Sequence, residues 1–208
     1  MPEDVTEVHE LLVREMLVLY MKYNFFKTLY CTCDASLQLL DEAAPSFFRV
    51  CAEIMRGDII LSICALTDPA SARVQGVNRY NLTVDYLKTL IPKSDSELTQ
   101  RVDDTLKKAK KCWEAFRLHR NRRVGHYDFE TILKKSEPLV PNLEIKETDA
   151  ALKFIADVLN TIQGYYEGSE TTYDGGIIVT DGAKELLEFI QRKNDLEKYF
   201  NHKEFGEN

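Results

Sequence analysis

The sequence predicts an all-α fold, and its composition is the first observation behind this prediction. The 208 residues include only nine glycines and six prolines, while 44% of the residues are hydrophobic and 29% are charged. Because chain breakers are scarce, this composition favours a mainly helical globule over a disordered chain or a strand-rich sandwich. The length fits one domain with a sizeable core and room for an appendage.

Hydrophobic periodicity is the second observation, and it defines the helices in order. Apolar residues at three- and four-residue steps predict a long amphipathic helix from about Asp4 to Tyr30. A second helix is predicted from Pro45 to Leu66, and Thr67-Asp68-Pro69 stops it because a residue before proline disfavours the helical conformation. Residues 70–79 are predicted to be a polar connection, and a shorter helix follows from Leu82 to Leu90.

The longest helical pattern begins after a cap at Ser94 or Ser96 and runs into a strongly basic segment. It carries a regular apolar stripe made of Leu98, Val102, Leu106, Ala109, Trp113 and Phe116. The next position on this stripe is Arg120, whose guanidinium cannot lose its proton and has no acid one helical turn away. We therefore expect Arg120 to pair with a carboxylate from another element or with a bound phosphate.

The chain after this helix is predicted to be more varied. A short helical turn is predicted at 129–135, and a loop bracketed by Pro138 and Pro141 follows it. The next helix is capped by Thr148 and runs from Asp149 to about Tyr166. A β-hairpin at 171–179, which turns at Asp174-Gly175-Gly176, then leads to a last helix from Asp181 to Phe200. We therefore divide the chain into a helical bundle over residues 1–166 and a hairpin with a C-terminal helix, packed on that bundle, over residues 167–208.

Charge is the third observation, and it bears on function. The chain has a formal net charge of −7, yet eight lysines and arginines lie between Lys107 and Arg123 against one acid, Glu114. A basic segment in an acidic protein predicts a local polyanion site rather than a general nucleic-acid-binding domain. For the lysines alone, a solvated helix face is the simpler interpretation.

Cysteine usage and hydropathy predict the compartment. The five cysteines lack the spacing of a disulfide framework, so we expect reduced thiols in a soluble, cytoplasmic protein. Cys31-Thr32-Cys33 lacks the two-residue gap of a zinc site, and we expect neither a metal nor a cofactor. The start of the chain does not read as a secretion signal, and the most apolar run, Ile59 to Leu66, is too short to span a bilayer.

The basic segment ends in a motif with a recognisable spacing. Arg120 and Asn121 are followed by His126, and Asp128 lies two residues beyond the histidine. Together with Leu66-Thr67-Asp68-Pro69 after an apolar helix, this motif resembles the HEPN superfamily, and most closely its AbiU2-like abortive-infection branch. The resemblance covers roughly residues 7–160.

The resemblance implies a fold, a partner and an activity. The fold is an all-α, HEPN-like bundle of four to five helices, here with a small C-terminal β-hairpin and a terminal helix, and it is usually a homodimer. The activity is metal-independent cleavage of RNA, in which a 2′-hydroxyl attacks the adjacent phosphate. His126 would act as acid or base, Arg120 would bind the phosphate, and Asn121 would orient one of them. The other RNA-contacting residues implied are Arg117, His119, Arg122 and Arg123.

Helix geometry constrains this site independently of the resemblance. Six residues at about 100° each put Arg120 and His126 about 120° apart on a regular helix, so the two cannot converge on one phosphate. Either Gly125 ends the helix, or a second copy of the chain completes the site across a two-fold axis. The same angles group His119, Arg122, Arg123 and His126 on one face, as a competing constellation.

Three functions stay open at this point. The first is a ribonuclease acting in phage defence or as a toxin. The second is a non-catalytic binding or scaffold protein of the same fold, in which an acid such as Glu53, Asp58 or Asp68 holds Arg120. The third is an antitoxin-like partner whose basic helix docks on an acidic protein.

Overall fold

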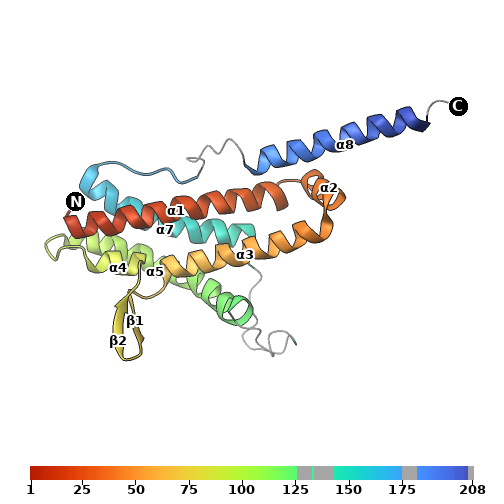
Figure 1. The fold of residues 1–208 in the computed structure, drawn as a ribbon. Coiled ribbons are helices and arrows are strands. Elements are labelled where there is room, and N and C mark those ends of the chain that lie inside the picture. The colour runs from red at the N-terminus through yellow and green to blue at the C-terminus, as the bar shows by residue number, and fades with distance from the viewer. Residues whose placement is uncertain (126–132, 134–142, 175–181, 206–208) are drawn as a thin grey trace. The chain divides into compact units, whose positions relative to one another are not determined.

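The computed structural model describes residues 1–125, 133, 143–174 and 182–205, and these residues are mainly helical (Figure 1). The helices are α1 (Glu3–Tyr30), α2 (Asp34–Ala43), α3 (Pro45–Thr67), α4 (Val84–Thr89), α5 (Ser96–His119), α7 (Ile145–Glu167) and α8 (Ala183–Phe205). A π-helical turn, η1 (Arg120–Val124), continues α5, and two short strands, β1 (Ser71–Val74) and β2 (Val77–Tyr80), pair with each other. The predicted all-α class is confirmed, as are the helices expected from Asp4 and Pro45.

The chain forms two compact units, which we describe separately. Unit 1 consists of residues 1–20 and 57–176, and unit 2 of residues 21–56 and 177–208. The long helices α1 and α3 each contribute one part to each unit. The division of the chain at residues 166 and 167 stays a prediction.

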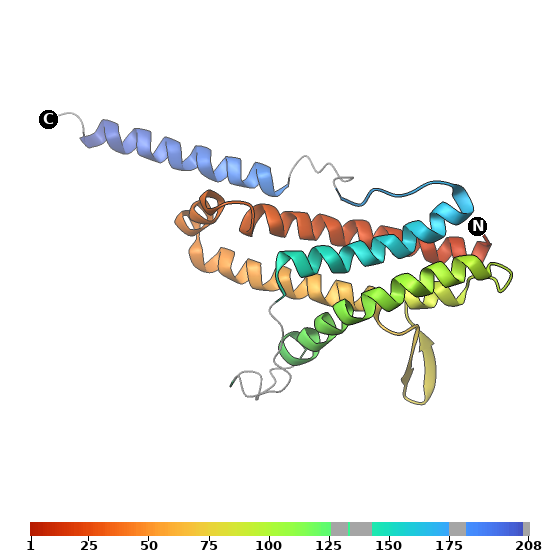
Figure 2. The same cartoon turned by 180° about the vertical axis from the view of Figure 1, so that it is seen from behind.

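The core of unit 1 lies between α5 and α7, which pack along each other (Figure 2). The stripe predicted on α5 is buried as expected at Leu98, Val102, Ala109, Trp113 and Phe116. From α7 the core receives Ala151, Leu152, Ile155, Val158, Leu159 and Ile162, none of which is exposed. Burying each large side chain is worth about 1.5–3 kcal/mol, so this helix pair contributes strongly to the stability of unit 1, together with the fully buried Leu12 and Met16 of α1 and Ile63 of α3.

The two helices of this pair begin differently from the prediction. Neither Ser94 nor Ser96 caps α5, because Asp95 occupies the N-cap position, where its carboxylate accepts a 2.5 Å hydrogen bond from Tyr166 on α7. Glu144 and Glu147 form a capping box at the start of α7. Thr148, the predicted cap, lies inside α7 and donates its hydroxyl to the Glu144 carbonyl.

A β-hairpin is present, but not where the sequence predicted one. Residues 70–79 were predicted to be a polar connection, whereas β1 and β2 pair antiparallel there and turn at Gln75 and Gly76, both with positive φ. A two-residue turn of this kind matches the twist of a hairpin. The signal was missed because each strand has only four residues, and β2 is exposed along its whole length.

The first strand of the hairpin predicted at 171–179 is absent, so this part of the prediction is wrong. Thr171 to Tyr173 form no strand, because the Asn160 side chain on α7 binds both the N–H and the carbonyl of Thr171 at 3.0 Å. Those backbone groups would otherwise be available to a strand partner. The second predicted strand, Ile177 to Val179, lies outside the described residues.

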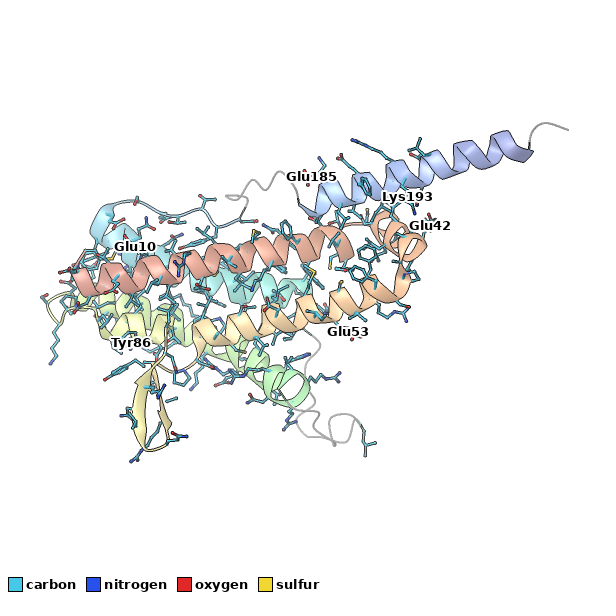
Figure 3. All side chains as sticks on the ribbon, in the orientation of Figure 1. Glu10, Glu42, Glu53, Tyr86, Glu185 and Lys193 are labelled. Carbon is cyan, nitrogen blue, oxygen red and sulfur yellow. The ribbon has the colours of Figure 1, made fainter. Side chains whose placement is uncertain are left out.

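Unit 2 has a smaller core. One buried hydrophobic cluster joins Leu29 of α1, Leu40 of α2, and Ala183 and Ile190 of α8, and Tyr23 and Phe26 of α1 are also buried. Helix α2 was not predicted, and α8 begins at Ala183, near the expected Asp181. Figure 3 labels Glu42 on α2 and Lys193 on α8; the Glu42 carboxylate accepts a 3.2 Å hydrogen bond from Asn194 on α8.

Two further predictions fall largely outside the described residues. These are the helical turn at 129–135, of which only Leu133 is described, as an exposed turn residue, and the loop bracketed by Pro138 and Pro141. Among the helices that are described, none combines the length and the hydrophobicity needed to cross a membrane.

Candidate anion site at the end of helix α5

The backbone changes its hydrogen-bond register where the motif begins. Helix α5 ends at His119, and Arg120 to Val124 form one π-helical turn, closed by a 2.7 Å hydrogen bond from the Gly125 N–H to the Arg120 carbonyl. A side-chain Cβ at Gly125 would lie only 3.3 Å from that carbonyl, so glycine suits the turn. Single π turns of this kind are frequent at functional sites. The helix therefore loses its regular form at Arg120, five residues before the glycine that we expected to end it.

Arg120 pairs with an acid from another element. Its Nη1 lies 2.6 Å from the Oδ2 of Asp68, the residue that follows α3. Its Nε donates a 3.0 Å hydrogen bond to the Oδ1 of the neighbouring Asn121. The Arg120 side chain is 25% exposed, so it is held in place and can still be reached from solvent. Of the three acids considered as partners, Asp68 is the one that makes this contact.

Arg117 shares the same carboxylate. Its Nη2 donates to the Thr67 carbonyl, and its Nε lies 3.4 Å from the Oδ1 of Asp68. This second contact is an ion pair without hydrogen-bond alignment, since neither atom has a hydrogen-bond partner among the described residues. Asp68 therefore lies between two guanidinium groups and balances only one of their two charges.

A groove opens beside these arginines. It has a volume of about 470 Å³ and is lined by Thr67, Asp68, Pro69, Asp85, Lys88, Asp103, Leu106, Lys107, Lys110, Trp113, Arg117 and Arg120. Five of these side chains are cationic and three are acidic. Each acid already has a partner: Asp103 pairs with Lys88, Asp85 accepts from the Ala70 N–H at 3.1 Å, and Asp68 holds the arginines. The groove is therefore net positive, as the charge pattern predicted.

A thiol close to the site is chemically inert. Cys64 on α3 is fully buried, and this burial raises its pKa to about 11, although the nearby Arg120 acts in the opposite direction. The protonated thiol is a poor nucleophile. Among the described residues, no group of three or more His, Cys, Asp or Glu side chains is placed to hold a metal ion.

His119, Arg122 and Arg123 of the predicted set do not line this groove. His119 and Arg122 are half-buried and each has an interaction partner, while Arg123 is exposed. His126 lies outside the described residues. The structure thus brings together Arg117, Arg120 and Asn121 of the predicted set.

The sequence contained a signal for the acid at this site. Asp68 follows the last residue of α3, where the partial negative charge of the helix end makes a carboxylate unfavourable unless a cation compensates it. Two residues of the groove, Lys88 and Asp85, were not considered, because nothing in their local pattern relates them to α5.

The bundle and the basic end of α5 define a protein of the HEPN class. The family model HEPN_AbiU2, described as AbiU2, matches residues 2–195. The chain therefore belongs to this family of HEPN-type abortive-infection proteins, which confirms the resemblance and extends it beyond residue 160 into α8. No curated protein and no solved structure matches the chain.

Proposed function

We propose that this protein is a metal-independent endoribonuclease that acts in phage defence or as a toxin. The observation that supports this most directly is the uneven charge around Asp68, where two arginines share one carboxylate beside a net-positive groove. The excess positive charge is half-buried, so a phosphate there would be bound in a less polar medium than water. RNA supplies that phosphate, and also the 2′-hydroxyl that can attack it.

The chemistry assigns a task to each residue of the motif. His126 takes the proton of the 2′-hydroxyl or gives one to the leaving 5′-oxygen, since its pKa range suits both tasks near neutral pH. The attack yields a 2′,3′-cyclic phosphate and a free 5′-hydroxyl. Arg120 stabilises the negative charge that grows on the phosphate oxygens.

The contacts of Arg120 are compatible with this role. Its bonds to Asp68 and Asn121 use Nη1 and Nε, while a guanidinium carries five N–H donors. Among the described residues these two bonds leave Nη2 available to a phosphate oxygen. Asp68 and Asn121 thereby act as positioning residues that fix the plane of the guanidinium.

We further propose that a second copy of the chain completes the site. The motivation is the family resemblance, which implies a homodimer whose site is assembled from the motif of both subunits. A mixture of inactive Arg120→Ala and His126→Ala proteins then forms dimers in which one site has both residues intact. Such a mixture should recover about a quarter of the parent activity if the partners exchange freely. Recovery of no activity, or sedimentation as a monomer only, contradicts the shared site.

A second function is favoured by the 2.6 Å contact between Arg120 and Asp68. If this ion pair is permanent, Arg120 is a structural residue and the protein is a non-catalytic binding or scaffold member of its family. An antitoxin-like role, with the basic helix α5 docked on an acidic protein, would follow from the same interpretation. Asp68→Asn separates the two functions. If the site binds RNA, this substitution leaves more positive charge available to the RNA phosphates. If the ion pair is structural, the substitution only lowers the stability of the fold.

The decisive experiment is incubation of the purified protein with mixed RNA in EDTA. We expect cleavage that leaves cyclic phosphate ends and is lost in His126→Ala, while DNA of the same sequence survives. His119→Ala is the matched control, because His119 belongs to the competing constellation. Cleavage that needs Mg²⁺, or that persists in His126→Ala, overturns the mechanism and favours the scaffold function.

A further inference from the structure

The β1–β2 hairpin presents a polar face with the composition of a nucleic-acid-binding surface. The register pairs Ser71 with Tyr80 and Arg73 with Asn78, so these four side chains lie on one face of the ribbon. All four residues are exposed. The segment from Ser71 to Tyr80 contains two arginines and no acid. Within the described residues, neither arginine has an ion-pair partner.

An aromatic pair stands at the base of this face. The rings of Tyr80 and Tyr86 have centroids 5.1 Å apart and are inclined by 30°. Tyr86, labelled in Figure 3, is fixed on α4, where its N–H donates to the Thr83 side chain at 3.1 Å. Tyr80 is nevertheless 72% exposed, which is unusual for so large a ring packed against another. One face of Tyr80 is therefore supported, and the other is open to a planar ligand.

The hairpin is anchored directly at the groove. Asn81, just after β2, bonds to the Ala70 and Pro69 carbonyls at 2.9 Å, and the Ala70 N–H bonds to Asp85. Pro69 and Asp85 line the same groove as Arg117 and Arg120. Both ribbon views show the hairpin and the C-terminal end of α5 on the same side of unit 1. The base of the hairpin thus borders the groove that contains the two arginines.

We propose that the hairpin binds the unpaired stretch of an RNA strand whose phosphate occupies the arginine site. This inference rests on the proposed function and names its substrate class. A base stacks on the open face of Tyr80, Arg73 binds a phosphate, and Asn78 contacts a base edge. The ligand is single-stranded, because the faces of paired bases are covered within a duplex. A polyanion fits this surface better than an apolar protein partner does, because the ribbon is basic.

The test measures RNA binding without cleavage. The His126→Ala protein is titrated against fluorescein-labelled oligouridylate, with fluorescence anisotropy as the readout. Adding Tyr80→Ala should weaken binding about tenfold, within the range of base–aromatic stacking, whereas Tyr80→Phe should keep the affinity. Tyr165→Ala is the control, since Tyr165 is also exposed and contacts a second tyrosine, Tyr166, although edge to face and on α7. Arg73→Ala should flatten the salt dependence of binding.

The outcomes separate this inference from the proposed function. If Tyr80→Ala binds oligouridylate as tightly as its parent, the hairpin site is overturned, even where the parent protein cleaves RNA. A loss of affinity as large in Tyr165→Ala as in Tyr80→Ala overturns it as well. If Tyr80→Ala weakens binding but no protein cleaves RNA, the hairpin site stands as a single-strand-binding surface and the ribonuclease proposal fails.

Discussion

Units 1 and 2 differ in how completely they bury their hydrophobic residues. In unit 1, α5 and α7 share a core in which most large side chains are fully buried. In unit 2, the cluster of Leu29, Leu40, Ala183 and Ile190 is smaller, and Phe47, Val50, Ile54 and Phe189 are more than half exposed. The candidate site lies in unit 1, on the better-packed pair of helices. A charged site needs rigid support, since misplacing a guanidinium by about 1 Å can cost about 100-fold in rate.

The largest expected effect is on catalysis in unit 1. Arg120→Ala should lower RNA cleavage at least about 100-fold, because it removes the group that stabilises the charge of the transition state. Arg120→Lys should restore little, since an ammonium cannot reproduce the fork held by Asp68 and Asn121. Single-turnover rates measure both. Arg14→Ala, which changes an exposed arginine of α1 that does not line the groove, serves as the control and should have a small effect.

A matched pair of isoleucines tests the difference in packing. Ile155 on α7 is completely buried and Ile190 on α8 is 7% exposed in a smaller core. Ile155→Ala should lower the free energy of unfolding by about 2–5 kcal/mol, and Ile190→Ala by about 2 kcal/mol or less. Urea denaturation gives both values. Equal losses would contradict the difference between the two units.

The buried His9 should make unit 1 sensitive to acid. Burial lowers the pKa of His9, although its hydrogen bond to the Leu159 carbonyl and the nearby Glu167 act in the opposite direction. The folded protein therefore holds His9 neutral, and the unfolded chain takes up a proton more readily. Stability is full above pH 6.5 and falls as the pH drops through the window between the unfolded and folded pKa values. One proton gives a slope of at most about 1.4 kcal/mol per pH unit.

The control for this pH effect is His9→Gln, which keeps a side-chain N–H for the Leu159 carbonyl but does not titrate. Unfolding free energies at pH 7.5 and pH 5.5 should differ less in His9→Gln than in the parent protein. A difference of the same size in both proteins would assign the acid sensitivity to carboxylates instead.

The smallest expected effect concerns the exposed residues of unit 2. Phe189→Ser on α8 should change the free energy of unfolding by no more than about 0.5 kcal/mol, because a side chain that is 68% exposed loses little burial. Thermal unfolding measures this change. A loss of unfolding free energy as large as that of Ile190→Ala would contradict this expectation. It would mean that Phe189 is covered in solution and that unit 2 is more tightly packed than the exposure of its residues indicates.

The sequence predicts the parts of this fold that have a regular hydrophobic period. The stripe on α5 and the start of α3 at Pro45 follow from spacing and from a helix-start signal, both of which are local. The β1–β2 hairpin was missed because strands of four residues are too short to establish a period, and β2 has no buried face. Helix α2 was missed in a short segment that contributes only Ser36 and Leu40 to the buried residues.

For the site, the sequence predicts which residue needs a partner but not which partner it finds. Arg120 on an apolar stripe demands an anion, and three acids were considered, yet Asp68 lies 52 residues away and the choice depends on tertiary packing. The π turn was also beyond prediction. A π turn shifts the backbone hydrogen bonds by one residue, and no distinct pattern of side chains marks it in the sequence. The position of His126 stays a prediction.

The π turn at Arg120 also determines how the loss of one residue would change the direction of the backbone after α5. A π turn accommodates one residue more than an α turn closes, so losing any one residue from Arg120 to Val124 would let α5 continue as a regular helix. Because the π turn takes up that extra residue within about one turn of helix, the backbone would then leave the turn in nearly the same direction. Loss of one residue here should therefore disturb the direction of the chain less than the same loss inside α5, where each residue contributes a rotation of about 100°.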